Sequence, residues 1–100
     1  MKQVTVAMVG DLILDQPAPM EQYFEEITPV LNSIDIMGGH VETPHTSRPE
    51  PSCIDIQAPP SAPENLDVLK GRFDVVSVAG NHAYDCGPNG IIDTIANLDR

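Results

Sequence analysis

Three short runs of mainly apolar residues lie near residues 3–9, 34–37 and 74–79, and each is followed directly by glycine. Short runs rich in Val and Ile predict β-strands. The first run is nearly continuous, which is typical of a strand that is buried on both faces of a sheet. We therefore predict three strands near these residues.

Between the runs, apolar residues recur at the spacing of a helix with one buried stripe. A first helix is predicted over residues 20–31, broken or kinked at Thr28 because Pro29 disfavours helical geometry in the residue before it. A second helix opens at Pro63 and Glu64, since proline and an acidic residue both suit a first turn. A third helix follows over residues 91–98. The apolar residues expected to face inward are Leu66 and Leu69 in the second helix and Ile91, Ile92, Ile95 and Leu98 in the third.

The predicted order is β-α-β-loop-α-β-α, so the fold class is α/β with a parallel sheet and right-handed crossovers. Six of the ten prolines lie between Thr43 and Pro63. They predict one long loop, with a short extended piece at residues 53–56. Loops of this length in a compact domain are usually functional or disordered.

Composition narrows the classes of function. The net charge is -10 and only five residues are Lys or Arg, which argues against sequence-independent binding to nucleic acid. No apolar run approaches the roughly 20 residues of a membrane span, and no signal-peptide pattern opens the chain, so a cytoplasmic location is the default expectation. Cys53 and Cys86 match no zinc or redox spacing and are expected to be free thiols.

Polar residues follow each predicted strand, and ligands of open parallel sheets bind beyond the carboxyl ends of the strands. Asp11 follows the first strand, Glu42 the second and Asn81 the third. Neighbouring strands are about 4.8 Å apart, so these three side chains can converge on one divalent cation. The alternative is that Asp11 caps a turn, Glu42 is a solvated loop acid, and Asn81 makes only a local hydrogen bond.

Four segments carry a family resemblance that extends over essentially the whole chain. Residues 10–15 read GDLILD, residues 35–44 read DIMGGHVETP, residues 73–87 read FDVVSVAGNHAYDCG, and residues 90–94 read GIIDT. They resemble the motifs of CapA-type capsule synthesis proteins, a branch of the calcineurin-like metallophosphatase superfamily. The third segment is the most specific, because a dozen positions match in order.

The resemblance implies that residues 1–100 are a single domain, the N-terminal β-α-β-α-β-α portion of a larger calcineurin-like metallophosphoesterase fold. It implies a metal-dependent hydrolase-like protein of capsule or poly-γ-glutamate synthesis, acting on an anionic small molecule or polymer. The implied cofactors are divalent metal ions (Mn, Zn, Mg or Fe), dinuclear only in the full-length protein. Many members of the family are membrane-anchored or extracytoplasmic.

The resemblance also assigns roles to residues. Asp11, Glu42 and Asn81 would be metal ligands. His82 would act near the leaving group, polarised by Asp85, since an imidazole held by a carboxylate is a suitable proton donor near neutral pH.

Three residues depart from the family's pattern. Ile13 stands where the superfamily has a histidine ligand, while His40 and Gly80 each replace an asparagine of the family's motifs. The chain is also much shorter than the family's domain and lacks its later histidines. Two alternatives therefore stay open: a non-catalytic accessory or binding module, and a truncated fragment with no activity of its own. A chain this short is expected to be marginally stable, or to self-associate through uncovered apolar surface.

Overall fold

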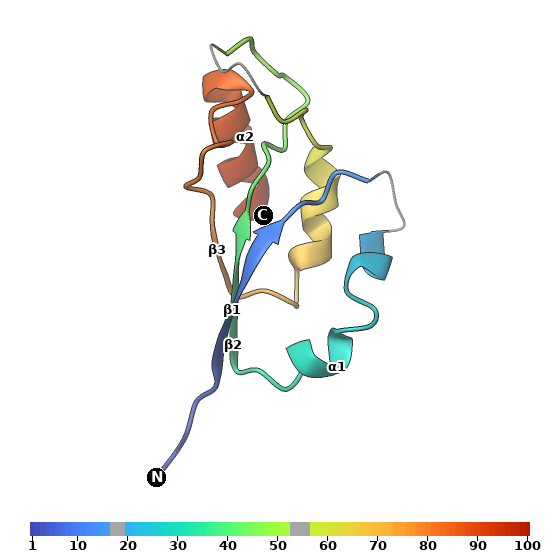
Figure 1. Cartoon of the computed structure of the whole chain (residues 1–100), viewed down its shortest axis with the longest axis vertical. Helices are drawn as coiled ribbons and strands as arrows, with labels where there is room; N and C mark the ends of the chain where they lie inside the picture. Colours follow the sequence, from blue (N-terminus) through green and yellow to red (C-terminus); the bar gives the residue numbers. More distant parts are fainter. Residues whose placement is uncertain (17–19, 53–56) are drawn as a thin grey trace.

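The computed structural model describes residues 1–16, 20–52 and 57–100 of the chain. It confirms the α/β class: a parallel sheet with helical segments packed against one of its faces (Figure 1). The elements, with η for a 3-10 helix, are β1 (Val6–Leu12), η1 (Met20–Tyr23), α1 (Thr28–Leu31), β2 (Ile36–Val41), η2 (Pro63–Leu69), β3 (Val75–Ser77) and α2 (Gly87–Leu98).

The sheet has the order β1-β2-β3, and both neighbouring pairs are parallel, as predicted. β1 and β2 reach further toward their carboxyl ends than the sequence pattern indicated, whereas β3 ends at Ser77, short of the predicted end at residue 79. Asp11 lies within β1 and pairs with His40 in β2, and His40 in turn pairs with Ser77 in β3. The parallel ladder therefore carries two residues that we expected in loops.

The predicted helix over residues 20–31 is wrong as a single element. A 3-10 turn occupies Met20–Tyr23, the chain then turns, and α1 begins only at Thr28. Pro29 lies in the first turn of α1, where a missing N–H removes no helical hydrogen bond. Only part of the predicted stripe is inward: Phe24 and Leu31 are buried, whereas Val30 is 61% exposed.

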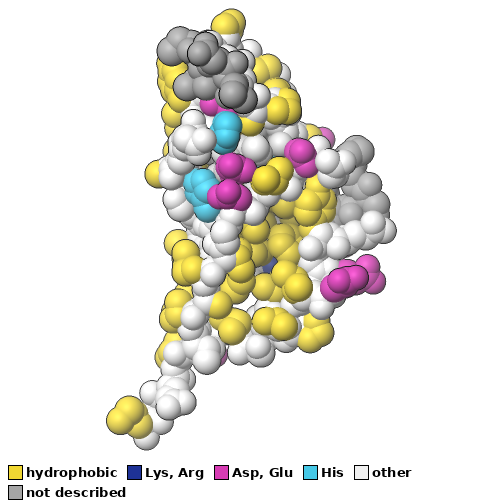
Figure 2. Space-filling view, in the orientation of Figure 1, with side chains coloured by type: hydrophobic (Ala, Val, Ile, Leu, Met, Phe, Trp, Pro, Cys, Tyr) yellow, Lys and Arg dark blue, Asp and Glu magenta, His cyan; other side chains and the backbone are white. Residues whose placement is uncertain are grey.

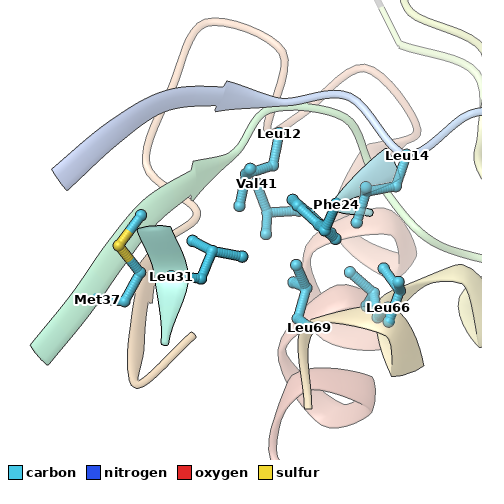
Figure 3. Close-up of a cluster of buried hydrophobic side chains, with 9 residues drawn as sticks. Leu12, Leu14, Phe24, Leu31, Met37, Val41, Leu66 and Leu69 are labelled. Carbon is cyan, nitrogen blue, oxygen red and sulfur yellow. The ribbon is translucent and has the colours of Figure 1, made fainter. Parts of the chain in front are cut away.

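The core lies between the sheet and these helical segments (Figure 3). Leu14 is 1% exposed and Val41 2% exposed, and the rings of Phe24 and Phe73 pack with centroids 5.5 Å apart. Leu66 and Leu69 of η2 are buried, which confirms their predicted inward orientation. Leu12 and Val41 are part of this core, so it holds the carboxyl ends of β1 and β2 in place.

The face that α2 turns inward differs from the prediction. Gly90 and Thr94 are buried, whereas Ile92 is 57% exposed and Ile95 is 42% exposed. The helix lies close to the loop after β2, since a Cβ atom added at Gly90 would be 3.3 Å from the Cβ of Pro44. The small residues of α2, and not the whole isoleucine stripe, therefore make this contact.

The second face of the sheet is uncovered by the described residues, so the prediction that the first strand is buried on both faces is wrong. Hydrophobic side chains lie along the strands on this outer face (Figure 2). The exposed members are Val6, Met8, Ile36 and Val75. Self-association through this surface stays a prediction, which sedimentation of the isolated chain can test.

The long loop after β2 is ordered where the structure describes it. His45 and Ser61 form a parallel bridge, and Thr46 N donates to Ser61 O at 3.1 Å. The extended piece predicted at residues 53–56, and with it Cys53, lies outside the described residues. No helix in the described part of the chain is long and apolar enough to cross a membrane.

Candidate functional site

The carboxyl ends of the three parallel strands place the candidate residues at one edge of the sheet. Asp11 and His40 are direct neighbours across the β1–β2 ladder. Glu42 follows β2 by one residue, and a turn at residues 81–86 follows β3. Figure 2 shows histidine and acidic side chains lying against one another over this part of the molecule.

His82 and Asp85 form the hydrogen-bonded pair that their spacing predicted. Nδ1 of His82 lies 2.6 Å from Oδ2 of Asp85, and the side chain of Asp85 is fully buried while that of His82 is 24% exposed. Because a carboxylate only accepts, Nδ1 carries the proton and donates it. Nε2 of His82 makes no hydrogen bond with any described residue.

A second contact holds the carboxylate in place. The backbone N–H of Ala58, in the long loop after β2, donates to the same oxygen of Asp85 at 2.6 Å. The other oxygen, Oδ1, is buried and has no hydrogen-bond partner among the described residues. The sequence did not reveal Ala58, because a backbone donor leaves no signal in residue type.

The surroundings of His82 favour its protonated form. The hydrogen bond to Asp85 raises the pKa of His82 most; partial burial opposes it, and the negative charges of Asp85, Glu42 and Asp11 raise the pKa further. The charged imidazole is a proton donor suited to neutral pH.

The predicted metal ligands are residue types that suit a divalent cation. Asp11 and Asn81 are exposed and Glu42 is half-buried, so their oxygens are open to solvent at the sheet edge. Carboxylate and amide oxygens suit hard or borderline cations. Within residues 1–16, 20–52 and 57–100, no three His, Cys, Asp or Glu side chains are already gathered around one point as a metal-binding group.

Comparison with known families shows to which family the chain belongs. The family model described as bacterial capsule synthesis protein PGA_cap matches residues 5–100. The chain belongs to this capsule synthesis family. A search of curated proteins found no match.

The departures of this capsule synthesis protein from its family's motifs have structural counterparts. Ile13 is 45% exposed and offers no donor atom beside Asp11. His40 and Gly80 are in contact: a Cβ atom added at Gly80 would lie 2.6 Å from Nε2 of His40. The imidazole therefore occupies the space that a side chain at position 80 would need.

His45 has a structural role in the capsule synthesis protein. It is 0% exposed, its N–H donates to Oγ1 of Thr94 at 2.9 Å, and its Nδ1 donates to Thr43 O at 2.8 Å. Burial lowers the pKa of His45, although the carbonyl groups of Thr43 and Leu14 oppose the shift. The backbone N–H of His45 thereby fastens the loop after β2 to α2, while the buried imidazole holds the carbonyl of Thr43 within that loop.

Glu50 is a further residue that sequence reasoning missed. Its Oε1 accepts from Nδ2 of Asn89 at 2.7 Å, and its backbone N–H donates to Cys86 O at 3.0 Å. A carboxylate at the start of α2 also suits the positive end of that helix. Glu50 thereby holds the long loop over the turn that contains His82 and Asp85.

Proposed function

We propose that this capsule synthesis protein is a metal-dependent hydrolase-like protein in which His82 supplies a proton to the leaving group of an anionic substrate. The observation that carries the proposal is the 2.6 Å pair of His82 and buried Asp85, in which Nδ1 is the engaged nitrogen and Nε2 makes no hydrogen bond with a described residue. The family membership supports a role in capsule synthesis.

In this proposal, the chain belongs to a calcineurin-like metallophosphoesterase fold, and the polymer is poly-γ-glutamate or a related anionic capsule polymer. Asp11, Glu42 and Asn81 are the residues that would hold divalent metal. Metal bound there supplies charge neutralisation for a phosphoryl or similar oxyanion.

Residues of the protein hold and orient the proton that His82 would transfer. Asp85 accepts a hydrogen bond from the Nδ1–H group of His82 and so fixes the tautomer and the orientation of the ring. Ala58 N–H holds Asp85. Nε2 then presents the transferable proton, and partial burial of His82 limits competition from water.

The experiment is metal-dependent hydrolysis of bis(p-nitrophenyl) phosphate and p-nitrophenyl phosphate by the longest natural protein that contains this sequence. We expect turnover with Mn, Zn, Mg or Fe that chelation removes. Asp11→Asn and Glu42→Gln should lower both turnover and metal content. Asp67→Asn is the matched control, since the Asp67 side chain is 49% exposed on η2 and pairs only with surface cations.

A second candidate is a non-catalytic binding module, and the exposed Ile13 beside Asp11 favours it because that position has no donor atom. The same experiment separates the two functions. Absence of turnover with every metal, together with retained binding of poly-γ-glutamate by calorimetry, would support the binding module and contradict the hydrolase.

A further inference from the structure

Glu50, in the long loop after β2, supplies α2 with a cap that the helix itself lacks. The N-cap residue, Cys86, makes no side-chain capping hydrogen bond. Instead, Oε2 of Glu50 accepts from the backbone N–H of Asn89 at 3.4 Å, and Oε1 accepts from Nδ2 of Asn89 at 2.7 Å. The N–H groups of a first helical turn need such a partner, which here comes from a distant segment. We call these contacts the Glu50 clamp.

Gly87 allows the close approach that the Glu50 clamp requires. Its φ is +70°, and a Cβ atom added there would lie 2.8 Å from both Cβ and Oε2 of Glu50, too close for a real side chain. The backbone N–H of Glu50 also donates to Cys86 O at 3.0 Å. Glu50 is therefore held, by its backbone and by its side chain, directly beside the turn that contains Asp85.

Hydrogen bonds lead from the Glu50 clamp to the imidazole of His82. Nε2 of Gln57 donates to the carbonyl oxygen of Ser52 at 2.9 Å and to its Oγ at 2.8 Å, so the two sides of the long loop are joined just beyond the clamp. The next residue, Ala58, donates its N–H to Oδ2 of Asp85 at 2.6 Å. The same oxygen accepts from Nδ1 of His82.

We propose that Glu50 is a positioning residue for the proton donor. Its clamp on α2 seats the long loop so that Ala58 N–H holds the carboxylate of Asp85, which in turn orients the ring of His82. Oδ1 of Asp85 has no partner among the described residues, so Oδ2 carries both contacts that orient the carboxylate. This inference rests on the proposed function of His82, but the orientation of its ring can be measured without hydrolysis.

Asn89→Asp releases the Glu50 clamp with little harm to the helix. It replaces the donor Nδ2 by a carboxylate oxygen, which repels the carboxylate of Glu50. An acidic residue in the first turn suits the positive end of α2, so the helix itself is not weakened. The double variant Glu50→Gln with Asn89→Asp restores the hydrogen bond with donor and acceptor exchanged.

Asn97→Asp is the matched control, since it makes the same substitution in the last turn of α2. Nδ2 of Asn97 donates to Asp93 O at 2.7 Å, a hydrogen bond within the helix. The control removes this bond and adds a negative charge at the negative end of α2, so it should weaken the helix more than Asn89→Asp does. It leaves the Glu50 clamp in place.

The readout is the proton NMR signal of the Nδ1–H group of His82, recorded at one fixed pH on the longest natural protein that contains this sequence. Its absence in His82→Ala assigns it. A proton donated to a buried carboxylate at 2.6 Å is shifted downfield and protected from exchange with water. Asn89→Asp should abolish the signal, the double variant should restore it, and Asn97→Asp should retain it.

Hydrolysis of p-nitrophenyl phosphate gives a second readout. The kcat of Asn89→Asp should fall by up to about 100-fold with KM unchanged, because a small misplacement of a catalytic group can cost this much. The double variant should recover most of the kcat, and Asn97→Asp should keep the kcat of the wild type per folded molecule.

The outcomes separate this proposal from the proposed function. If Asn89→Asp keeps the signal, or if Asn97→Asp loses it to the same extent, the positioning role of Glu50 is overturned whether or not the protein is a hydrolase. If the signals behave as expected but no metal supports turnover by the wild type, the proposed function is wrong while the hold of Glu50 on His82 stands. If Asn89→Asp does not fold, Glu50→Ala removes the acceptor without adding charge and gives the same test. A wild type without the signal would contradict the pair of His82 and Asp85 and, with it, both proposals.

Discussion

The loops that follow β2 and β3 each hold a histidine, in opposite surroundings. His45, after β2, is 0% exposed and is held by backbone and hydroxyl groups, so burial lowers its pKa. His82, after β3, is half-buried and bonded to a carboxylate, so its pKa is raised. The imidazole is therefore a buried structural group in one loop and a candidate proton donor in the other, and its burial and hydrogen-bond partner decide which.

Asp85 lies in the turn after β3 and also hydrogen-bonds the loop after β2. Its replacement should therefore have the largest effect on stability. Asp85→Ala removes the acceptor of His82 Nδ1 and of Ala58 N–H. Hydrogen bonds to a charged group contribute about 1.5–3 kcal/mol each, so we expect the two together to cost about 3–6 kcal/mol in urea unfolding. Turnover per folded molecule should fall as well.

Asp67→Ala is the control for this change. The Asp67 side chain is 49% exposed and pairs with the exposed side chains of Lys70 and Arg100, and surface ion pairs contribute about 0–1 kcal/mol. A loss for Asp85→Ala no greater than for Asp67→Ala would contradict the view that one buried carboxylate joins the two loops.

Thr94→Val should have a smaller effect, confined to the structural loop. It leaves the N–H of His45 buried without its acceptor, which costs about 1–3 kcal/mol. Thr94→Ser keeps the hydroxyl and should retain most of the stability. Turnover per folded molecule should be unchanged in both variants. A specific fall in turnover for Thr94→Val would contradict a purely structural role for the loop after β2.

The pH dependence of stability should show the smallest effect. An unfolded histidine binds a proton near pH 6.5, whereas burial lowers the pKa of His45 in the fold. The stability due to neutral His45 is thus present above about pH 6.5 and is lost as the pH falls, by at most about 1.4 kcal/mol per pH unit.

His45→Asn tests this dependence, since its amide can still donate to Thr43 O. Urea unfolding from pH 7.5 down to pH 5 should be less steep for His45→Asn than for the wild type. Parallel curves would mean that His45 does not resist protonation in the fold.

Local sequence signals predicted the sheet and one contact of the site. Short apolar runs ended by glycine predicted the three strands, and their alternation with helical patterns predicted the parallel pairing. The spacing of His82 and Asp85 within one short turn was enough for their hydrogen bond. Both features depend on residues that are near in sequence or on a strong apolar pattern.

Features that depend on distant contacts were predicted poorly. Pairing across the ladder extends β1 to Leu12 and β2 to Val41, although glycines within these segments suggested that the strands had ended. The contact of Gly90 with Pro44 rotates α2 away from its isoleucine stripe. Ala58 and Glu50 act through the fold of the long loop, which residue types alone do not encode.

The most direct test of the central claim compares the two histidines in one assay. Turnover, metal content and melting temperature would be measured for His82→Ala and His45→Asn in the longest natural protein that contains this sequence. Loss of a general acid costs about 10²–10⁴ in rate, so His82→Ala should lose turnover by this factor while it stays folded and metal-loaded. His45→Asn should lose stability and keep turnover per folded molecule. If His82→Ala keeps full turnover, or loses it only by unfolding, the catalytic role of His82 is wrong.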